Sequence, residues 1–192
     1  LSFMDQAVRE EPDAPDIHYF IGEANRFMGE FDTAIQSYEM ALDLNPDFAP
    51  AYLGRALAQL GLDPDFNMVP DLQSAIALEP NYADAHLEFA NYQLGQGSPG
   101  AALEVLEFVE GLLVGDPRYY QLRALAELAL GLDEQALEDA QKAFEMDITD
   151  LETYLILAEA YFENDQPREA EQAVFTYGQY RQDDARYWAF SG

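Results

Sequence analysis

Apolar residues recur along the chain at spacings of three and four, which predicts a series of short amphipathic helices. The segments "IHYFIGEANRFMG" and "DTAIQSYEMALDL" are a first pair, with Gly29 between them and Asn45-Pro46 after them. Glycine suits the left-handed residue that ends a helix, and the residue before a proline avoids the helical region. The pattern therefore predicts a hairpin of two helices, with its turn at Gly29 and its exit at Pro46.

The marks of this hairpin return with a period of 34 residues. Small residues and turn residues align as Ala34, Ala102, Ala136 and Ala170, as Ala41, Ala75 and Ala143, as Gly29, Gly97 and Gly131, and as Pro46 and Pro80. A slot for a ring holds His18, Tyr52, His86, Tyr120, Tyr154 and Trp188. We expect a single array over residues 1–192, made of full units 15–48, 49–82, 83–116, 117–150 and 151–184 between partial units 1–14 and 185–192.

A 34-residue period is typical of helix–turn–helix solenoids, and these residues resemble the tetratricopeptide repeat (TPR) family. The first unit carries Gly22, Gly29, Phe31, Ala34, Tyr38, Ala41 and Pro46 at the matching positions, and the fifth carries Tyr154, Leu157, Ala158, Tyr161, Ala170 and Val174. The resemblance implies an all-α fold, a right-handed α-solenoid (superhelix) of TPR units. It also implies that the first helices line a concave groove, which the family uses to hold extended or helical peptides.

The resemblance assigns one set of positions on the first helices to this groove. They are Tyr19, Phe20, Glu23, Phe27, Leu53, Leu57, Leu60, Leu87, Glu88, Asn91, Leu94, Gln121, Leu122, Leu125, Leu128, Leu155, Ile156, Glu159 and Phe162. The middle of this set is apolar and its rims are acidic, so we expect a protein-interaction scaffold whose partner is an apolar peptide or helix with basic flanks. The family's carboxylate clamp for chaperone tails needs several basic side chains, whereas Arg26, Arg118 and Asn91 lie far apart.

Other interpretations remain open at this point. The leucines could instead pack against one another, and the array could be a spacer between functional domains. The ends at residues 1–11 and 185–192 lack polar caps, which would allow self-assembly into a homo-oligomer through stacked ends. The array could also be the accessory region of a larger enzyme or of a secretion or assembly complex.

The charge narrows the class of partner. Asp and Glu number 37 against 9 Lys and Arg, a net charge of −28, which disfavours nucleic acid and anionic lipid surfaces and favours basic partners. Solubility or adaptation to high salt would explain the same composition. No stretch approaches the ~20 apolar residues of a membrane span, so we expect no membrane insertion and a cytoplasmic location. With no cysteine, a disulfide framework is excluded.

Three groups of residues are candidates for catalysis or metal binding. His18 and His86 occupy the ring slot, so we expect packing rather than catalysis or metal binding. The run "DPDFN" from Asp63 to Asn67 begins like a calcium loop but lacks the later glycine and glutamate. The acidic clusters "EVLEFVE" and "DEQALEDA" are interpreted as solvated faces, without a pocket that would raise a pKa. We therefore expect no enzyme activity, no cofactor and no metal.

Residues that depart from the repeat pattern lead to further predictions. Asp116 should cap the helix that begins at Pro117, and Pro99 should open a second helix. In the second unit the second helix should start late, near Pro70, after a loop at 62–69. Arg55 and Arg123 replace the apolar residues of other units, and we expect structural ion pairs with Glu23 and Glu88 of neighbouring units.

Overall fold

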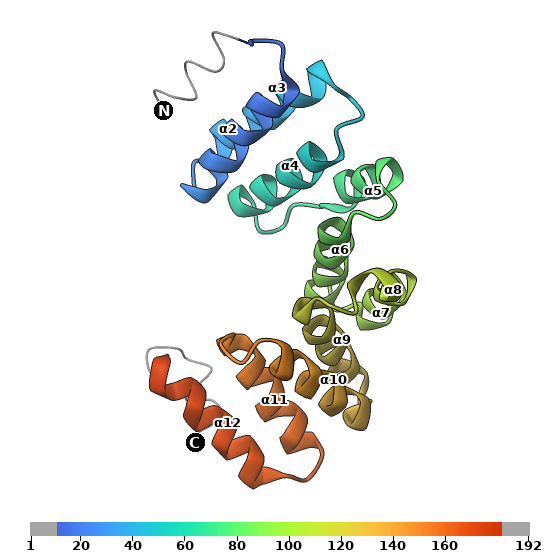
Figure 1. Ribbon diagram of the computed structural model, residues 1–192, viewed down its shortest axis with the longest axis vertical. Helices are drawn as coiled ribbons and strands as arrows, with labels where there is room; N and C mark the ends of the chain where they lie inside the picture. Colours follow the sequence, from blue (N-terminus) through green and yellow to red (C-terminus); the bar gives the residue numbers. More distant parts are fainter. Residues whose placement is uncertain (1–10, 182–192) are drawn as a thin grey trace. The chain divides into compact units, whose positions relative to one another are not determined.

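The computed structural model describes residues 11–181, where all regular secondary structure is α-helical (Figure 1). The helices are α2 (Pro15–Phe27), α3 (Phe31–Leu44), α4 (Ala49–Leu62), α5 (Val69–Leu78), α6 (Ala83–Gly95), α7 (Pro99–Phe108), α8 (Glu110–Leu113), α9 (Pro117–Leu130), α10 (Asp133–Met146), α11 (Leu151–Glu163) and α12 (Pro167–Tyr180). Successive pairs fall within the 34-residue repeats of the sequence, with α7 and α8 sharing one repeat. The fold is an all-α helical repeat solenoid.

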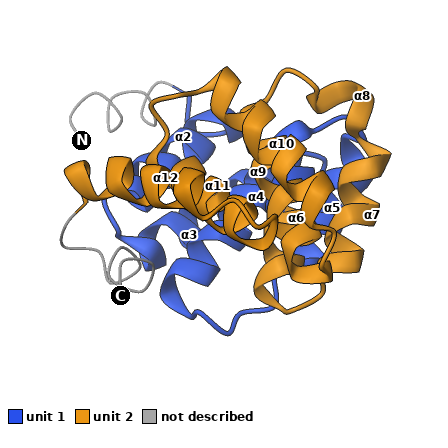
Figure 2. Ribbon diagram, turned by 90° about the horizontal axis from the view of Figure 1, so that it is seen from below, with its two compact units in different colours: residues 1–88 blue, residues 89–192 orange. Residues whose placement is uncertain are grey.

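The chain divides into two compact units, residues 1–88 (unit 1) and 89–192 (unit 2) (Figure 2). Unit 1 contains α2 to α5 and unit 2 contains α7 to α12, and the division falls within α6. Within unit 1, α3 packs on α2 and α4, and within unit 2, α10 packs on α9 and α11. Each unit is described by itself below, and the grouping of all repeats into one array remains a prediction.

Most helix ends follow the turn chemistry expected of the repeat. Gly29, Gly97 and Gly131 have φ of 76°, 67° and 69°, the left-handed conformation that glycine adopts without steric cost. Asp165 occupies the same position of the next repeat with φ of 57°, and aspartate is one of the few other residues found there. The second repeat ends differently, because Asp63 is extended at φ −132° and a loop runs to Met68 before α5 begins.

The predicted starts of helices are confirmed. The Asp116 carboxylate accepts a hydrogen bond from the backbone N–H of Arg118 at 2.9 Å, α7 begins at Pro99, and Pro70 lies in the first turn of α5. One interruption was not expected: the second helix of the third repeat breaks at Val109 into α7 and α8. Gly111 and Gly115 follow the break, and glycine lowers helix propensity by about 1 kcal/mol.

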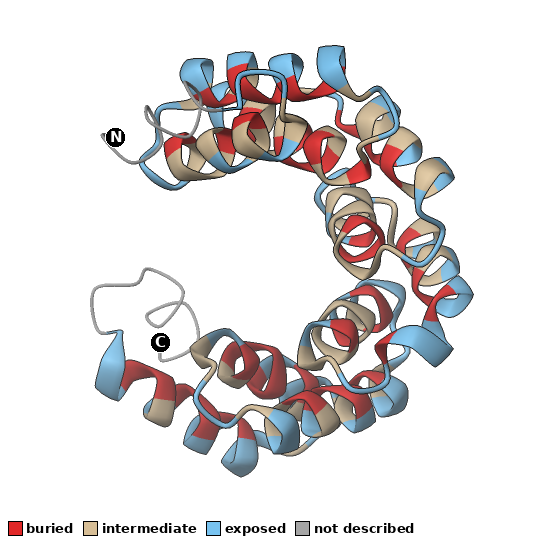
Figure 3. Cartoon of the chain, turned by 45° about the horizontal axis from the view of Figure 1, so that its top comes forward, coloured by how far each residue is buried: buried red, intermediate tan, exposed pale blue. Residues whose placement is uncertain are grey.

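Small residues form much of the interior. The aligned alanines are buried, for instance Ala34, Ala41, Ala75 and Ala102, and buried positions face the partner helices within each unit (Figure 3). In unit 1 the buried ring of Tyr38 lies against two glycines: a Cβ built on Gly22 or Gly54 would lie 2.6 Å or 2.5 Å from its Cε1. Only glycine fits at these two helical positions.

The ring slot joins consecutive repeats by one recurring hydrogen bond. His18 Nε2 lies 2.9 Å from the carbonyl oxygen of Pro12, and His86 Nε2 lies 2.9 Å from that of Pro80. The tyrosine hydroxyls do the same: Tyr52 donates to Pro46, Tyr120 to Val114 and Tyr154 to Ile148, at 3.1, 3.4 and 3.1 Å. Each ring therefore ties its first helix to the segment six residues upstream, which confirms a structural role for both histidines.

Two expectations lie outside the described residues: most of the partial unit 1–14, whose residues 1–10 are not described, and the partial unit 185–192 with Trp188. Among residues 11–181, no helix is both long and apolar enough to cross a membrane.

Candidate functional site

The first-helix face of unit 1 lies on α2 and α4, which contact each other. Phe20 and Phe27 are 61% and 77% exposed there, and Tyr19, Leu57 and Leu60 are half-buried. Leu53 is buried, because its side chain turns into the helix packing. The predicted face exists in this unit, but Leu53 is not available to a ligand.

Glu23, which was expected to steer basic flanks, is engaged inside unit 1. Its carboxylate lies 2.9 Å from Arg26 Nη2 and accepts a hydrogen bond from the Tyr38 hydroxyl. Burial opposes its ionisation, but the hydrogen bonds from Arg26 and Tyr38 outweigh burial and hold the pKa of Glu23 below its usual value. The same pairing occupies Arg26, so it does not serve a carboxylate clamp.

The first-helix face of unit 2 lies on α9 and α11, which also contact each other. Phe162 is 63% exposed, Leu125 is exposed, and Gln121, Leu122 and Leu128 are half-buried. Glu159 is exposed, and partial desolvation together with the nearby Glu163 raises its pKa. Leu155 and Ile156 are buried in the packing of α11, which removes them from the predicted groove.

The remaining predicted positions are on α6, the helix that contains the division between the units. Leu87 is buried, Glu88 and Leu94 are half-buried, and Asn91 is exposed. Of the predicted set, Leu53, Leu87, Leu155 and Ile156 are therefore corrected to interior positions, and the others keep some exposure.

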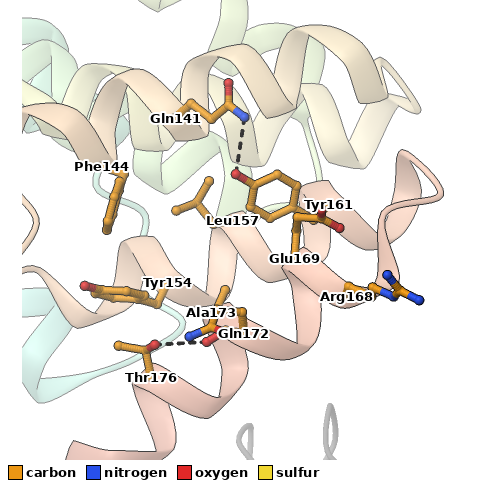
Figure 4. Close-up of a pocket in the computed structure, with 10 residues that line it drawn as sticks. All are labelled: Gln141, Phe144, Tyr154, Leu157, Tyr161, Arg168, Glu169, Gln172, Ala173 and Thr176. Carbon is orange, nitrogen blue, oxygen red and sulfur yellow. Dashed lines mark hydrogen bonds between the residues drawn. The ribbon is translucent and has the colours of Figure 1, made fainter.

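A cavity of about 550 Å³ opens in unit 2 on the second-helix side, and we name it the apolar pocket. It is lined by residues of α10, α11 and α12, namely Gln141, Phe144, Tyr154, Leu157, Tyr161, Arg168, Glu169, Gln172, Ala173 and Thr176 (Figure 4). Its volume is within the range of pockets that bind small ligands or anchor side chains. No position of this pocket was in the predicted set.

Aromatic rings dominate the apolar pocket. Phe144 and Tyr154 meet edge to face with centroids 5.3 Å apart, and Gln141 Nε2 donates to the Tyr161 hydroxyl at 3.3 Å. In Figure 4 the rings lie around Leu157, whereas Arg168 extends away from them. Such a lining favours another aromatic or large aliphatic group.

Comparison with other repeats shows how the chemistry at this position varies. At the positions of Leu157 and Ala173, the second repeat has Arg55 and Asp71, whose side chains pair bidentately at 2.8 and 2.6 Å. The fourth repeat has Arg123 and Asp139, with Nε and Oδ2 2.7 Å apart. Each arginine thus pairs with an aspartate on the second helix of its own repeat. The expected partner of Arg55, Glu23, was wrong, whereas Arg123 Nη1 also lies 3.8 Å from a carboxylate oxygen of Glu110 in the preceding repeat.

The same position one repeat earlier forms a second cavity in unit 2, of about 520 Å³. We name it the acidic pocket; it is lined by Leu103, Glu107, Glu110, Tyr119, Arg123, Glu127, Leu132 and Gln135. Glu107, Glu110 and Glu127 stand where the apolar pocket has Gln141, Phe144 and Tyr161. Two neighbouring pockets of one architecture therefore differ in chemistry.

Two carboxyl groups are buried at the acidic pocket. Glu127 is 6% exposed and Asp139 is 1% exposed, and Lys142 Nζ lies 3.4 Å from Asp139. Burial, and next the charge of Asp139, raises the pKa of Glu127 to about 7. Burial also raises the pKa of Asp139, against the attraction of Arg123 and Lys142. The interpretation of "DEQALEDA" as a solvated face without a raised pKa was wrong, because Asp139 belongs to an internal ion pair.

These groups predict a pH dependence of stability. A carboxyl whose folded pKa is raised is better protonated in the folded chain than in the unfolded chain, so its stabilising contribution is complete below about pH 4.5 and is lost as the pH rises to about 7. We expect Glu127→Gln to remove this loss. Urea unfolding of both proteins between pH 4.5 and 8 measures the difference; parallel pH profiles would contradict the assignment.

The comparisons with known proteins agree on one family. Two tetratricopeptide repeat models match residues 15–48 and 128–191, together just over half of the chain. Among curated proteins, Protein STIP1 homolog of Dictyostelium discoideum is 29% identical over 116 residues. That match spans 59% of this chain and 18% of the relative, so the chain corresponds to a small part of that protein.

Solved structures show the same fold at low identity. A structure of pilF from Pseudomonas aeruginosa gives a TM-score of 0.81 at 18% identity and covers 94% of this chain and 82% of that one. The APC/C hetero-tetramer Cut9-Hcn1 gives 0.86 at 16%, over 96% of this chain and 37% of that one. YrrB, described as a TPR protein with an unusual peptide-binding site, gives 0.70 at 16%, over 97% and 96%. At these identities the likeness concerns the fold alone.

Proposed function

Because the chain belongs to the tetratricopeptide repeat family, we propose that it is a protein-interaction scaffold that binds a peptide or helix of a partner protein on the first-helix faces of its repeats. The observation that carries this proposal is the exposure of large aromatic side chains on first helices: Phe20 and Phe27 in unit 1, and Phe162 in unit 2. Exposed aromatic residues beside half-buried leucines are the usual anchors of protein recognition.

The partner's chemistry follows from the charge around these anchors. With a net charge of −28, the protein attracts segments with basic flanks, and rim charges mainly set association rate and salt dependence. Glu159 is exposed and can attract a basic flank of the partner, whereas the Glu23 carboxylate is already bonded to Arg26 and Tyr38. YrrB, described as a TPR protein with an unusual peptide-binding site, supports a peptide as the ligand.

Related expectations stay part of this proposal. The role we propose is non-catalytic, and we place the protein in the cytoplasm. Stacking through residues 1–11 and 185–192 is the competing hypothesis, and it predicts a mass that grows with protein concentration in light scattering. An accessory role in a larger enzyme or assembly is a further alternative.

Paired variants test the first-helix faces. Phe27→Asp and Phe162→Asp remove anchors on first helices, and Phe108→Asp and Phe175→Asp make the same change at exposed sites on second helices. Affinity capture from native lysate should lose partners with the first pair and retain them with the second, and a confirmed partner should bind at least about tenfold more weakly, which corresponds to about 1.4 kcal/mol. Circular dichroism checks that all four variants fold. Equal capture by both pairs would overturn the proposal.

A further inference from the structure

The two pockets of unit 2 have complementary chemistry on either side of one helix. Gln135 of α10 lines the acidic pocket and Phe144 of α10 lines the apolar pocket. These residues are nine positions apart, and at about 100° per residue they lie on opposite faces of α10. The helix therefore separates the pockets, and its breadth of about 10 Å sets the distance between them.

Within residues 11–181, no side chain fills the apolar pocket. At the equivalent positions, Arg55 with Asp71 and Arg123 with Asp139 place long paired side chains, whereas Leu157 and Ala173 are short and uncharged. The rings of Phe144, Tyr154 and Tyr161 line this pocket. An aromatic side chain from outside would restore ring contacts there.

The acidic pocket contains a carboxylate oxygen with an unmet hydrogen-bonding need. Glu127 Oε2 is buried and accepts no hydrogen bond within the described part of the chain, which is costly for a buried polar atom. Its Oε1 lies 3.9 Å from Arg123 Nη2, but that guanidinium is directed to Asp139 and to the Tyr119 hydroxyl, at 2.7 and 3.0 Å. A lysine or arginine from outside would donate to Glu127, with Glu107 and Glu110 at the rim.

We propose that the two pockets together bind one extended segment of a partner protein, with a lysine or arginine side chain in the acidic pocket and an aromatic side chain in the apolar pocket. The helices around the two pockets carry the negative charge that attracts a basic side chain. The sequence of α10 contains five acidic residues and one basic, and that of α12 contains two acidic and one basic. An extended chain advances about 3.3–3.6 Å per residue, so crossing α10 separates the two anchors by about three or four residues.

This site is distinct from the one under "Proposed function". Tyr154, Leu157 and Tyr161 form one face of α11, and Glu159 and Phe162 lie on the other side of the same helix by the 100° rule. Variants of Phe162 and variants of the pockets therefore report on different surfaces, and either proposal can fail without the other.

The probe is a synthetic peptide, acetyl-Gly-Lys-Gly-Ser-Gly-Phe-Gly-amide, titrated into the nitrogen-15-labelled full chain and followed by amide chemical shifts. We expect saturable shifts confined to α7 through α12, the helices that line the two pockets. Replacing the peptide's Lys by Glu, or its Phe by Ala, should weaken binding at least fivefold each. Equal binding of all three peptides, or no saturable shift up to 5 mM peptide, roughly the weak limit of specific recognition, would overturn the proposal.

The sequences of two other repeats suggest a protein variant that tests the apolar pocket. Leu157→Arg with Ala173→Asp installs the pair that the second and fourth repeats already carry, so it places charged side chains against the rings of the apolar pocket in a combination that this fold accommodates. We name it the charged-pair variant. Glu127→Gln removes the buried carboxyl group of the acidic pocket with little change in shape. Each should weaken the Lys–Phe peptide at least fivefold, while Phe175→Asp should leave its affinity unchanged.

Unchanged affinity in Glu127→Gln and in the charged-pair variant would show that the peptide does not use the pockets. A dimer that the charged-pair variant abolishes in sedimentation, and that the peptide does not displace, would identify a second copy of the chain as the occupant and would also overturn the proposal. If the charged-pair variant does not fold, Glu127→Gln and the peptide series decide the outcome.

Discussion

Replacing Arg123 by leucine should lower the free energy of unfolding of unit 2 by about 3 kcal/mol, because breaking a buried ion pair leaves an uncompensated charge. Arg123 faces two buried carboxyl groups, those of Asp139 and Glu127. Without the guanidinium, the only other cation near Asp139 within the described residues is Lys142, 3.4 Å away. One carboxyl would have to take up a proton or remain charged in a poor environment.

The fifth repeat indicates how the loss can be repaired. There Leu157 and Ala173 occupy the two positions without any ion pair, so Arg123→Leu with Asp139→Ala should cost far less, about 1 kcal/mol, than the single change. Urea unfolding at pH 7.5 measures both variants, and the deficit of the single variant should shrink at pH 5, where its carboxyl groups protonate more readily. Equal stability of the single and double variants would contradict the pairing.

Gly54→Ala should destabilise unit 1 by about 2 kcal/mol, even though alanine is the better helix former. The added Cβ would lie 2.5 Å from Tyr38 Cε1, and overpacking of a filled core costs about 1–3 kcal/mol. The ring cannot easily move aside, because Tyr38 is fully buried and its hydroxyl is bonded to Glu23.

Gly100→Ala is the matched control for this prediction. Gly100 lies in the first turn of α7 with nothing within 4 Å of an added Cβ, so the change should stabilise the chain by up to about 1 kcal/mol. Thermal unfolding of both variants gives the comparison. A destabilisation of similar size at both glycines would show that helix position, and not contact with Tyr38, determines the effect.

The helix pairs were predictable because their marks repeat along the chain. Alanine at the close approach of two helices, glycine at the turn and proline after the exit each have a physical reason and a fixed spacing, so five repeats reinforce one another. Val109 has no such periodic mark, because the helix break at this residue depends on the balance between local helix propensity and side-chain packing. The left-handed conformation of Asp165 was not predicted either, because aspartate usually prefers other backbone angles.

The candidate site was less predictable. The repeat register places residues on the first helices, but it does not say which of their side chains the packing covers, and Leu53 and Leu155 are buried. The pockets on the second-helix side follow from pairs 16 residues apart, arginine with aspartate in two repeats and leucine with alanine in another. That signal was present in the sequence, but it becomes interpretable only when both positions are known to face each other.

The hydrogen bond from the ring slot has a consequence for dissecting the chain. Its donor is the fourth residue of a repeat, and its acceptor lies three residues before the first residue of that repeat, as with Tyr52 and Pro46 or Tyr154 and Ile148. A fragment cut at the start of a repeat would lose this bond, whereas one that starts at least three residues earlier would keep it. The natural unit for transplanting or deleting repeats is therefore out of phase with the helical hairpin, and each module includes the tail of its predecessor.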